Sequence, residues 1–205
     1  MPIIAKNKGD GFDPISEGVH VATCYSVVDL GMQYSEKFAK SSRKILITFE
    51  IPDEIITIEG KDLPRASSKE YTLSLSEKST LRKDLQAWRG KAFTEQELEG
   101  FDLVNLIGKG CQVQIIHKQK TSGTYSEIAS IMGLPKGVKV GETVNEHIYF
   151  DLENPESLNL LGKIPQWVQD KIKKSETYQN LTSCVNAVYE GGTNYDDGGN
   201  DELPF

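Results

Sequence analysis

Basic and aromatic residues occur together in two segments of the chain. Residues 34–44 contain four basic residues, one acid and two aromatic rings. Residues 109–139 contain five basic residues, the single acid Glu127 and the aromatic Tyr125. Cationic side chains neutralise phosphates and aromatic rings stack on unpaired bases, and single-strand binding needs both. The two segments are therefore candidates for contacts with single-stranded nucleic acid.

We expect the contacts with single-stranded DNA to come from these segments and one neighbouring strand, through Tyr34, Lys37, Phe38, Lys40, Arg43, Lys44, Lys69, His117, Lys118, Lys120 and Tyr125. Tyr34 and Phe38 are the favoured stacking residues, because aromatic rings in a polar segment have no evident core to fill. Tyr125 shares a strand face with Ala129 and Ile131 and could equally fill a barrel interior. Lysine-rich segments are often only solvated, which is the alternative for each lysine.

The sequence contains no arrangement of residues typical of an enzyme or a metal site. The three histidines are isolated, the acids show no ligand spacing, and neither a P-loop nor an H-E-x-x-H motif occurs. The cysteines Cys24, Cys111 and Cys184 are odd in number and far apart, which argues against zinc sites and a disulfide framework. We expect a non-enzyme without metal or cofactor, in a reducing cytoplasm. No apolar run approaches the length of a membrane span.

The charge of the chain is unevenly distributed. The net charge of −7 argues against a nucleic-acid partner. Residues 190–205, however, contain five acids and no base, and the rest of the chain has 25 acidic and 23 basic residues, or −2. The body is therefore nearly neutral, and the C-terminal segment carries most of the excess.

The C-terminal segment ends in an apolar tip behind an acidic spacer. A terminal aromatic ring can enter an apolar pocket while the chain carboxylate and nearby acids meet a basic rim. We expect this tip to recruit partner proteins through Asp196, Asp197, Asp201, Glu202, Leu203, Pro204 and Phe205. An acidic solubilising tail explains the aspartates but not the final Leu-Pro-Phe.

The hydrophobic pattern predicts five strands with a helix between the third and the fourth. Alternating residues predict strands over 19–28, 44–51, 69–75, 111–117 and 124–132. Leu81, Leu85 and Trp88 form the stripe of a helix over 77–88 with Ser76 as its N-cap, and Thr94 with Glu97 indicates a capping box. This order favours a mainly β, α+β chain with a five-stranded OB-fold barrel, although a β-sandwich with an inserted helix has the same order.

The barrel interpretation divides the chain into four parts. We expect a flexible arm over 1–13, the OB-fold domain over 14–150, an extension over 151–180 and a disordered acidic tail over 181–205. Residues 147–150 could add a strand. A short helix over 164–174 is expected to pack on the barrel through Ile164, Trp167, Val168 and Ile172. The ligand groove is then lined by the first–second loop, residues 31–44, and the fourth–fifth loop, residues 117–125.

Two resemblances to known proteins accompany this interpretation. The residues Asp201-Glu202-Leu203-Pro204-Phe205 resemble the acidic tip of bacterial single-stranded DNA-binding proteins, with Glu-Leu where Asp-Ile is usual. Residues 17–175 resemble a family of small phage proteins, through the segments KEYTLSL at 69–75, LRKDLQAWRG at 81–90, GFDL at 100–103 and LPKG at 134–137. The resemblance implies an OB fold and single-stranded DNA binding in phage replication or recombination, within the cytoplasm of an infected bacterium. It assigns no contact residues.

Two other functions share these features. The same basic segments would serve a strand-annealing recombination protein, and the acidic tail would serve a DNA-mimicking module that binds only proteins. The sequence does not separate DNA from RNA, because both offer phosphates and stackable bases. A homodimer is possible, since a lone barrel often needs duplication to bind long strands tightly.

Overall fold

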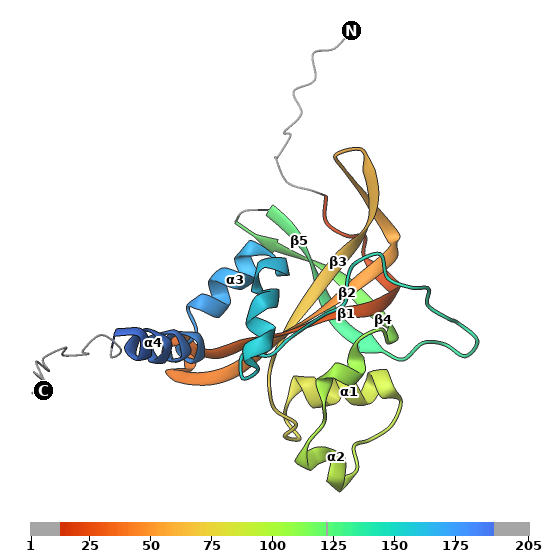
Figure 1. Cartoon of the computed structure of the whole chain (residues 1–205). Coiled ribbons are helices and arrows are strands. Elements are labelled where there is room, and N and C mark those ends of the chain that lie inside the picture. Colours follow the sequence, from red (N-terminus) through yellow and green to blue (C-terminus); the bar gives the residue numbers. More distant parts are fainter. Residues whose placement is uncertain (1–12, 122, 191–205) are drawn as a thin grey trace, which may run out of the picture.

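The centre of the molecule is a strongly bent sheet (Figure 1). The structure, a computed structural model, describes residues 13–121 and 123–190. Its strands are β1 (Gly18–Ser35), β2 (Lys40–Ile58), β3 (Lys61–Thr72), β4 (Gly110–Lys120), β5 (Gly123–Met132) and β6 (Ile148–Phe150). The order is β3-β2-β1-β4-β5 with antiparallel neighbours, and β6 pairs in parallel with β1. The expectation of a mainly β, α+β chain is confirmed.

Successive side chains along the strands point to opposite faces of the sheet, and each face contributes apolar residues to a buried core. Ile45, Ile47 and Phe49 of β2 lie in the main core together with residues of β1, β4 and β5, as the sequence predicts. The opposite face of β1 and β2 contributes Val28, Leu30 and Leu46 to a second core. Segments beyond β5 cover this second core. The sheet is therefore a wall between two apolar clusters, and only part of its outer face is open.

The predicted helix between β3 and β4 is present but begins later than expected. Helix α1 (Thr80–Arg89) has Ser79 as its N-cap residue, so the prediction of Ser76 is wrong. The backbone N–H of Ser79 donates to the carbonyl of Ser76 at 2.9 Å, so residues 76–79 form a separate turn before the helix. Leu81, Leu85 and Trp88 are buried in the main core as predicted.

A short helical segment follows α1 at the same end of the sheet (Figure 1). Helix α2 (Glu95–Glu99) begins with the predicted capping box between Thr94 and Glu97. A 3₁₀ turn, η2 (Leu103–Leu106), then leads into β4. These elements close one end of the main core, because Phe93 and Leu106 are buried there.

The C-terminal extension packs against the outer face of β1 and β2. It contains the 3₁₀ segment η3 (Pro155–Lys163), α3 (Gln166–Lys173) and α4 (Glu176–Glu190). Ile164, Val168 and Ile172 are buried in the second core, as predicted. The placement of Trp167 in that apolar stripe is wrong, since its side chain is 57% exposed. The helix starts only after Pro165, so helical spacing from Ile164 does not turn Trp167 inward.

Three further boundaries differ from the expectations. The predicted loop over 31–44 consists mainly of strand, because β1 and β2 continue to a turn at 36–39 that contains the 3₁₀ turn η1 (Glu36–Phe38). The predicted loop over 117–125 is likewise the end of the β4–β5 hairpin. Helix α4 occupies residues 181–190, which the sequence assigned to the tail.

No backbone ladder joins β3 to β5 within the parts of the chain that the structure describes. Instead, the Lys69 ammonium of β3 donates to the Ala129 carbonyl of β5 at 3.0 Å. The two edge strands are thus linked by a side chain rather than closed into a continuous barrel. Among the described helices, none has the length and apolar character needed to cross a membrane.

Candidate nucleic-acid interface

The β1–β2 tip, residues 34–40, presents two aromatic rings to solvent. Tyr34 is 61% exposed at the end of β1, and Phe38 is 72% exposed at the end of η1. The Lys37 ammonium lies 5.5 Å from the centre of the Phe38 ring. Within residues 13–121 and 123–190, neither Lys37 nor Lys40 forms an ion pair. The tip therefore offers exposed rings and free cations side by side.

The β4–β5 tip, residues 118–121 and 123–125, combines a second ring with cations. The Lys120 ammonium lies 4.4 Å from the centre of the half-buried Tyr125 ring. Lys118 pairs with Glu127 across the hairpin at 2.6 Å, and this hydrogen bond raises the pKa of Lys118. Both lysines are exposed, but Lys118 is matched by Glu127, whereas Lys120 forms no ion pair among the described residues.

The two tips lie at opposite ends of β1. Strand register pairs Ser35 with Lys40 at the C-terminal end of β1, next to the first tip. At the N-terminal end of β1, Gly18 pairs with Ile115, and β4 continues beyond it to the second tip. A single ligand that contacts both tips must follow the length of the sheet, past the C-terminal extension (Figure 1).

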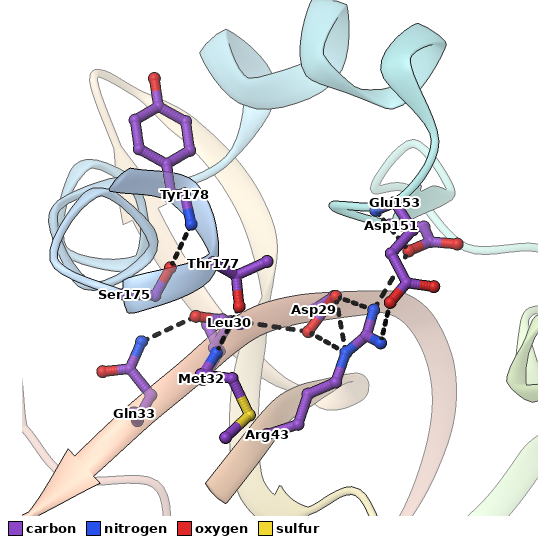
Figure 2. Close-up of polar contacts among 11 residues, drawn as sticks. Asp29, Leu30, Met32, Gln33, Arg43, Asp151, Glu153, Ser175, Thr177 and Tyr178 are labelled. Atoms are coloured by element: carbon purple, nitrogen blue, oxygen red, sulfur yellow. Dashed lines mark hydrogen bonds and ion pairs between the residues drawn. The ribbon is translucent and has the colours of Figure 1, made fainter. Parts of the chain in front are cut away.

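Arg43, a predicted phosphate contact, faces three carboxylates instead of solvent (Figure 2). Its guanidinium lies 2.6 Å from Asp29, 3.5 Å from Asp151 and 2.5 Å from Glu153. The hydrogen bonds that the guanidinium donates to the Asp29 carboxylate raise the pKa of Arg43. Asp151 and Glu153 follow β6, so Arg43 ties the start of the C-terminal extension to the hairpin.

Three other predicted contacts also have intramolecular partners. Lys69 pairs with Asp84 of α1 at 2.8 Å, in addition to its bond to β5. The His117 ring nitrogen Nε2 is 2.8 Å from the Ile15 carbonyl, and the Lys44 ammonium donates to the Thr72 hydroxyl at 2.8 Å. These side chains hold neighbouring segments together. The structure therefore concentrates the free candidates at the two tips, in Tyr34, Lys37, Phe38, Lys40, Lys120 and Tyr125.

Helix α4 braces the β1–β2 hairpin from one side (Figure 2). The Thr177 hydroxyl accepts the backbone N–H of Met32 at 2.9 Å, and the Ser41 hydroxyl donates to Glu176 at 2.6 Å. The helix approaches so closely that a Cβ on Gly31 would lie 2.6 Å from the Ser175 hydroxyl oxygen. Gly31 also has φ +71°, a conformation that favours glycine. The hairpin is thus held rigidly behind its exposed tip.

Sequence reasoning missed a groove between α3 and the outer face of the sheet. It measures about 430 Å³, and its lining includes Tyr25, Thr48 and Ser68 of the strands and Trp167 of α3. Burial, followed by the Glu50 carboxylate, raises the pKa of Tyr25 above its ordinary value. The signal in the sequence was Pro165, because a helix that begins after this proline does not place Trp167 on the buried side.

The described His, Cys, Asp and Glu side chains form no group that could hold a metal ion. The predicted partner-binding residues Asp196, Asp197, Asp201, Glu202, Leu203, Pro204 and Phe205 lie outside the described residues. A scan against protein-family models and a search of curated proteins find no match for this chain. The resemblance to phage and bacterial proteins therefore stays a prediction.

Proposed function

We propose that this protein binds single-stranded DNA without sequence preference, through an OB-type sheet and its two hairpin tips. The strand order supports this assignment, because β1 pairs with both β2 and β4, and α1 separates β3 from β4. The bond from Lys69 to Ala129 brings β3 next to β5, as a closing barrel requires. OB folds bind oligonucleotides on the β2–β3 face and at the loops after strands 1 and 4.

The observation that carries the proposal is the exposed pair Tyr34 and Phe38 beside Lys37 and Lys40. Large aromatic rings this exposed leave apolar surface in water, although the hairpin behind them is well packed. An unpaired base stacking on such a ring contributes about 1–3 kcal/mol and needs no particular base. The Lys37 ammonium beside the Phe38 ring, together with Lys40 at the same tip, neutralises the phosphates of the stacked nucleotides.

In this arrangement, Lys37, Lys40 and Lys120 bind phosphates, and Tyr34, Phe38 and Tyr125 stack on bases. Arg43, Lys69 and His117 are left out of the interface, because their partners within the chain already satisfy them. The strand runs from one tip to the other along the outer face of the sheet. The acidic tip then recruits replication or recombination proteins through its terminal Phe205 while the body holds the DNA.

Fluorescence anisotropy with labelled oligo-dT, oligo-rU and a duplex, at two salt concentrations, tests the proposal. Tyr34→Ala and Phe38→Ala each weaken single-strand binding by roughly 5- to 150-fold if each ring stacks on one base. Lys37→Ala and Lys40→Ala each reduce the slope of log K against log salt by about 0.7. Lys61→Ala, which removes an exposed lysine from the first position of β3, is the matched control and leaves both values unchanged.

Two results contradict the proposal. One is tighter binding of the duplex than of oligo-dT, since a paired base cannot stack on a protein ring. The other is an absence of oligo-dT binding at low salt, which favours a module that binds only proteins. Equal affinity for oligo-rU extends the ligand to RNA and leaves the binding surface as proposed.

A further inference from the structure

We infer that the groove beside α3 holds one unpaired base of the bound strand, stacked on Trp167. This inference deepens the proposed function and rests on it. The α3 groove, defined by Tyr25, Thr48, Ala66, Ser68 and Trp167, is separate from both hairpin tips. Its main aromatic residue comes from the C-terminal extension rather than from the sheet.

Trp167 is held in place without being buried. Val168 and Ile172, on the inner side of α3, are buried against the sheet, and the Gln169 side chain donates to the Ile164 carbonyl at 2.7 Å. The helix is therefore fixed, while the indole beside Val168 stays 57% exposed at the groove. A fixed and exposed ring is a prepared stacking surface, since little conformational freedom remains to be lost on binding.

The charges beside the groove favour a neutral ligand over a phosphate. Lys163, which lines the groove, pairs with Glu146 at 2.6 Å. Lys171 of α3 pairs with Glu70 of β3, where the helix meets the strand. Both nearby cations are thus matched by carboxylates, and a phosphate would have to displace one of them.

The floor of the groove suits the polar edge of a base. The Thr48 and Ser68 hydroxyls lie 3.0 Å apart on neighbouring strands, and each hydroxyl has both donor and acceptor capacity. Tyr25, which has a third hydroxyl, also lines the groove. A flat, neutral, aromatic ligand with donors and acceptors on its edge matches an indole wall and a hydroxyl floor. A nucleobase has this chemistry.

The position of the groove connects it to the proposed interface. Its floor belongs to β1, β2 and β3, and β1 and β2 end at the tip that carries Tyr34 and Phe38. A strand that follows the outer face from this tip meets α3 before it reaches the β4–β5 tip. The base that enters the groove therefore belongs to the same bound strand.

Tryptophan fluorescence and anisotropy together test the inference. The chain has two tryptophans, and Trp88 is buried, so quenching by unlabelled oligo-dT of about 16 nucleotides reports on Trp167. We expect saturating oligo-dT to quench the wild-type protein. Trp167→Phe retains a stacking ring, so it removes the quenching while the affinity measured by anisotropy changes by less than threefold.

Two further variants measure the contribution to affinity. Trp167→Ala weakens oligo-dT binding by roughly 5- to 150-fold, as expected for the loss of one stacked base. Ala66→Leu places a larger side chain in the groove without changing α3, and it weakens binding in the same direction. Leu158→Ala removes an exposed apolar side chain of η3 outside the groove and is the matched control, with unchanged affinity.

The outcomes separate this inference from the proposed function. If the wild-type protein binds oligo-dT by anisotropy but shows no quenching, the groove assignment is wrong and single-strand binding still stands. The same holds if Trp167→Ala binds oligo-dT with full affinity. An absence of binding in the wild-type protein overturns both. The assignment of a base to the groove is supported if Ala66→Leu abolishes the quenching and this variant has the same unfolding free energy as the wild type.

Discussion

Replacing Arg43 by methionine should destabilise the protein rather than weaken its affinity for DNA. The Arg43 side chain is 28% exposed, and its guanidinium lies 2.6 Å from Asp29, whose side chain is only 7% exposed. Methionine keeps most of the side-chain volume but removes the positive charge. The buried Asp29 carboxyl group would then lose its cationic partner and keep the Gly31 N–H at 2.9 Å as its remaining described partner.

The expected loss follows from the burial of the Asp29–Arg43 pair. Removing one partner of a fully buried ion pair costs about 3–5 kcal/mol. Here the partial exposure of Arg43 and the remaining Gly31 bond reduce the cost to about 2–3 kcal/mol. For a chain of this size, the melting temperature should fall by about 5–10 °C.

Urea unfolding followed by the fluorescence of buried Trp88 measures this loss. A double-mutant cycle adds Asp29→Asn and the double variant, in which the unpaired charge is absent. We expect the double variant to be more stable than the sum of the two single changes predicts, by at least 1 kcal/mol as an order of magnitude. Lys40→Met, a change on the same strand at a residue without an ion pair to any described residue, is the matched control and should stay within about 0.5 kcal/mol of the wild type.

A different pattern would refute the reasoning. If Arg43→Met unfolds at the wild-type urea concentration, the ion pair contributes nothing to stability. If the same variant also loses oligo-dT affinity and its salt slope falls by about 0.7, Arg43 binds a phosphate after all. The assignment of Arg43 to the fold rather than to the interface would then be wrong.

Three more predictions follow from the fold and the tail. Gly31→Ala should lower the unfolding free energy by at least about 2 kcal/mol in the same urea assay, because it combines a positive φ with a clash against Ser175. Burial raises the pKa of Cys24 from 9.0 to about 12, and burial raises the pKa of Cys111 as well. The unfolded chain therefore loses these protons first, and urea titrations between pH 8 and pH 10 should show stability falling by about 1 kcal/mol for each thiol; a flat profile would contradict this. Deleting residues 196–205 should leave oligo-dT affinity equal or higher while abolishing the capture of replication or recombination proteins, and a loss of oligo-dT binding would contradict the proposed role of the tip.

Much of the fold was predictable because its signals are local. Ile45, Ile47 and Phe49 alternate along one strand, and alternation alone determines which face can be buried. Leu81, Leu85 and Trp88 repeat at helical spacing for the same reason. The capping box of Thr94 and Glu97 spans only four residues, so the sequence at the start of the helix is enough to predict it.

Which basic side chains stabilise the fold and which remain available to a ligand depends on contacts between distant segments, and a local sequence pattern does not predict these contacts. Lys37 and Arg43 occur in one basic segment, yet Arg43 meets Glu153, which is 110 residues away, while Lys37 has no ion-pair partner in the part of the chain that the structure describes. The exposure of Trp167 likewise depends on how α3 docks against the sheet. Sequence alone determined where cations and rings occur along the chain, because residue type and periodicity are local properties. Only the tertiary structure decided which of them remain available to a ligand, because distant segments must meet before a charge gains its partner.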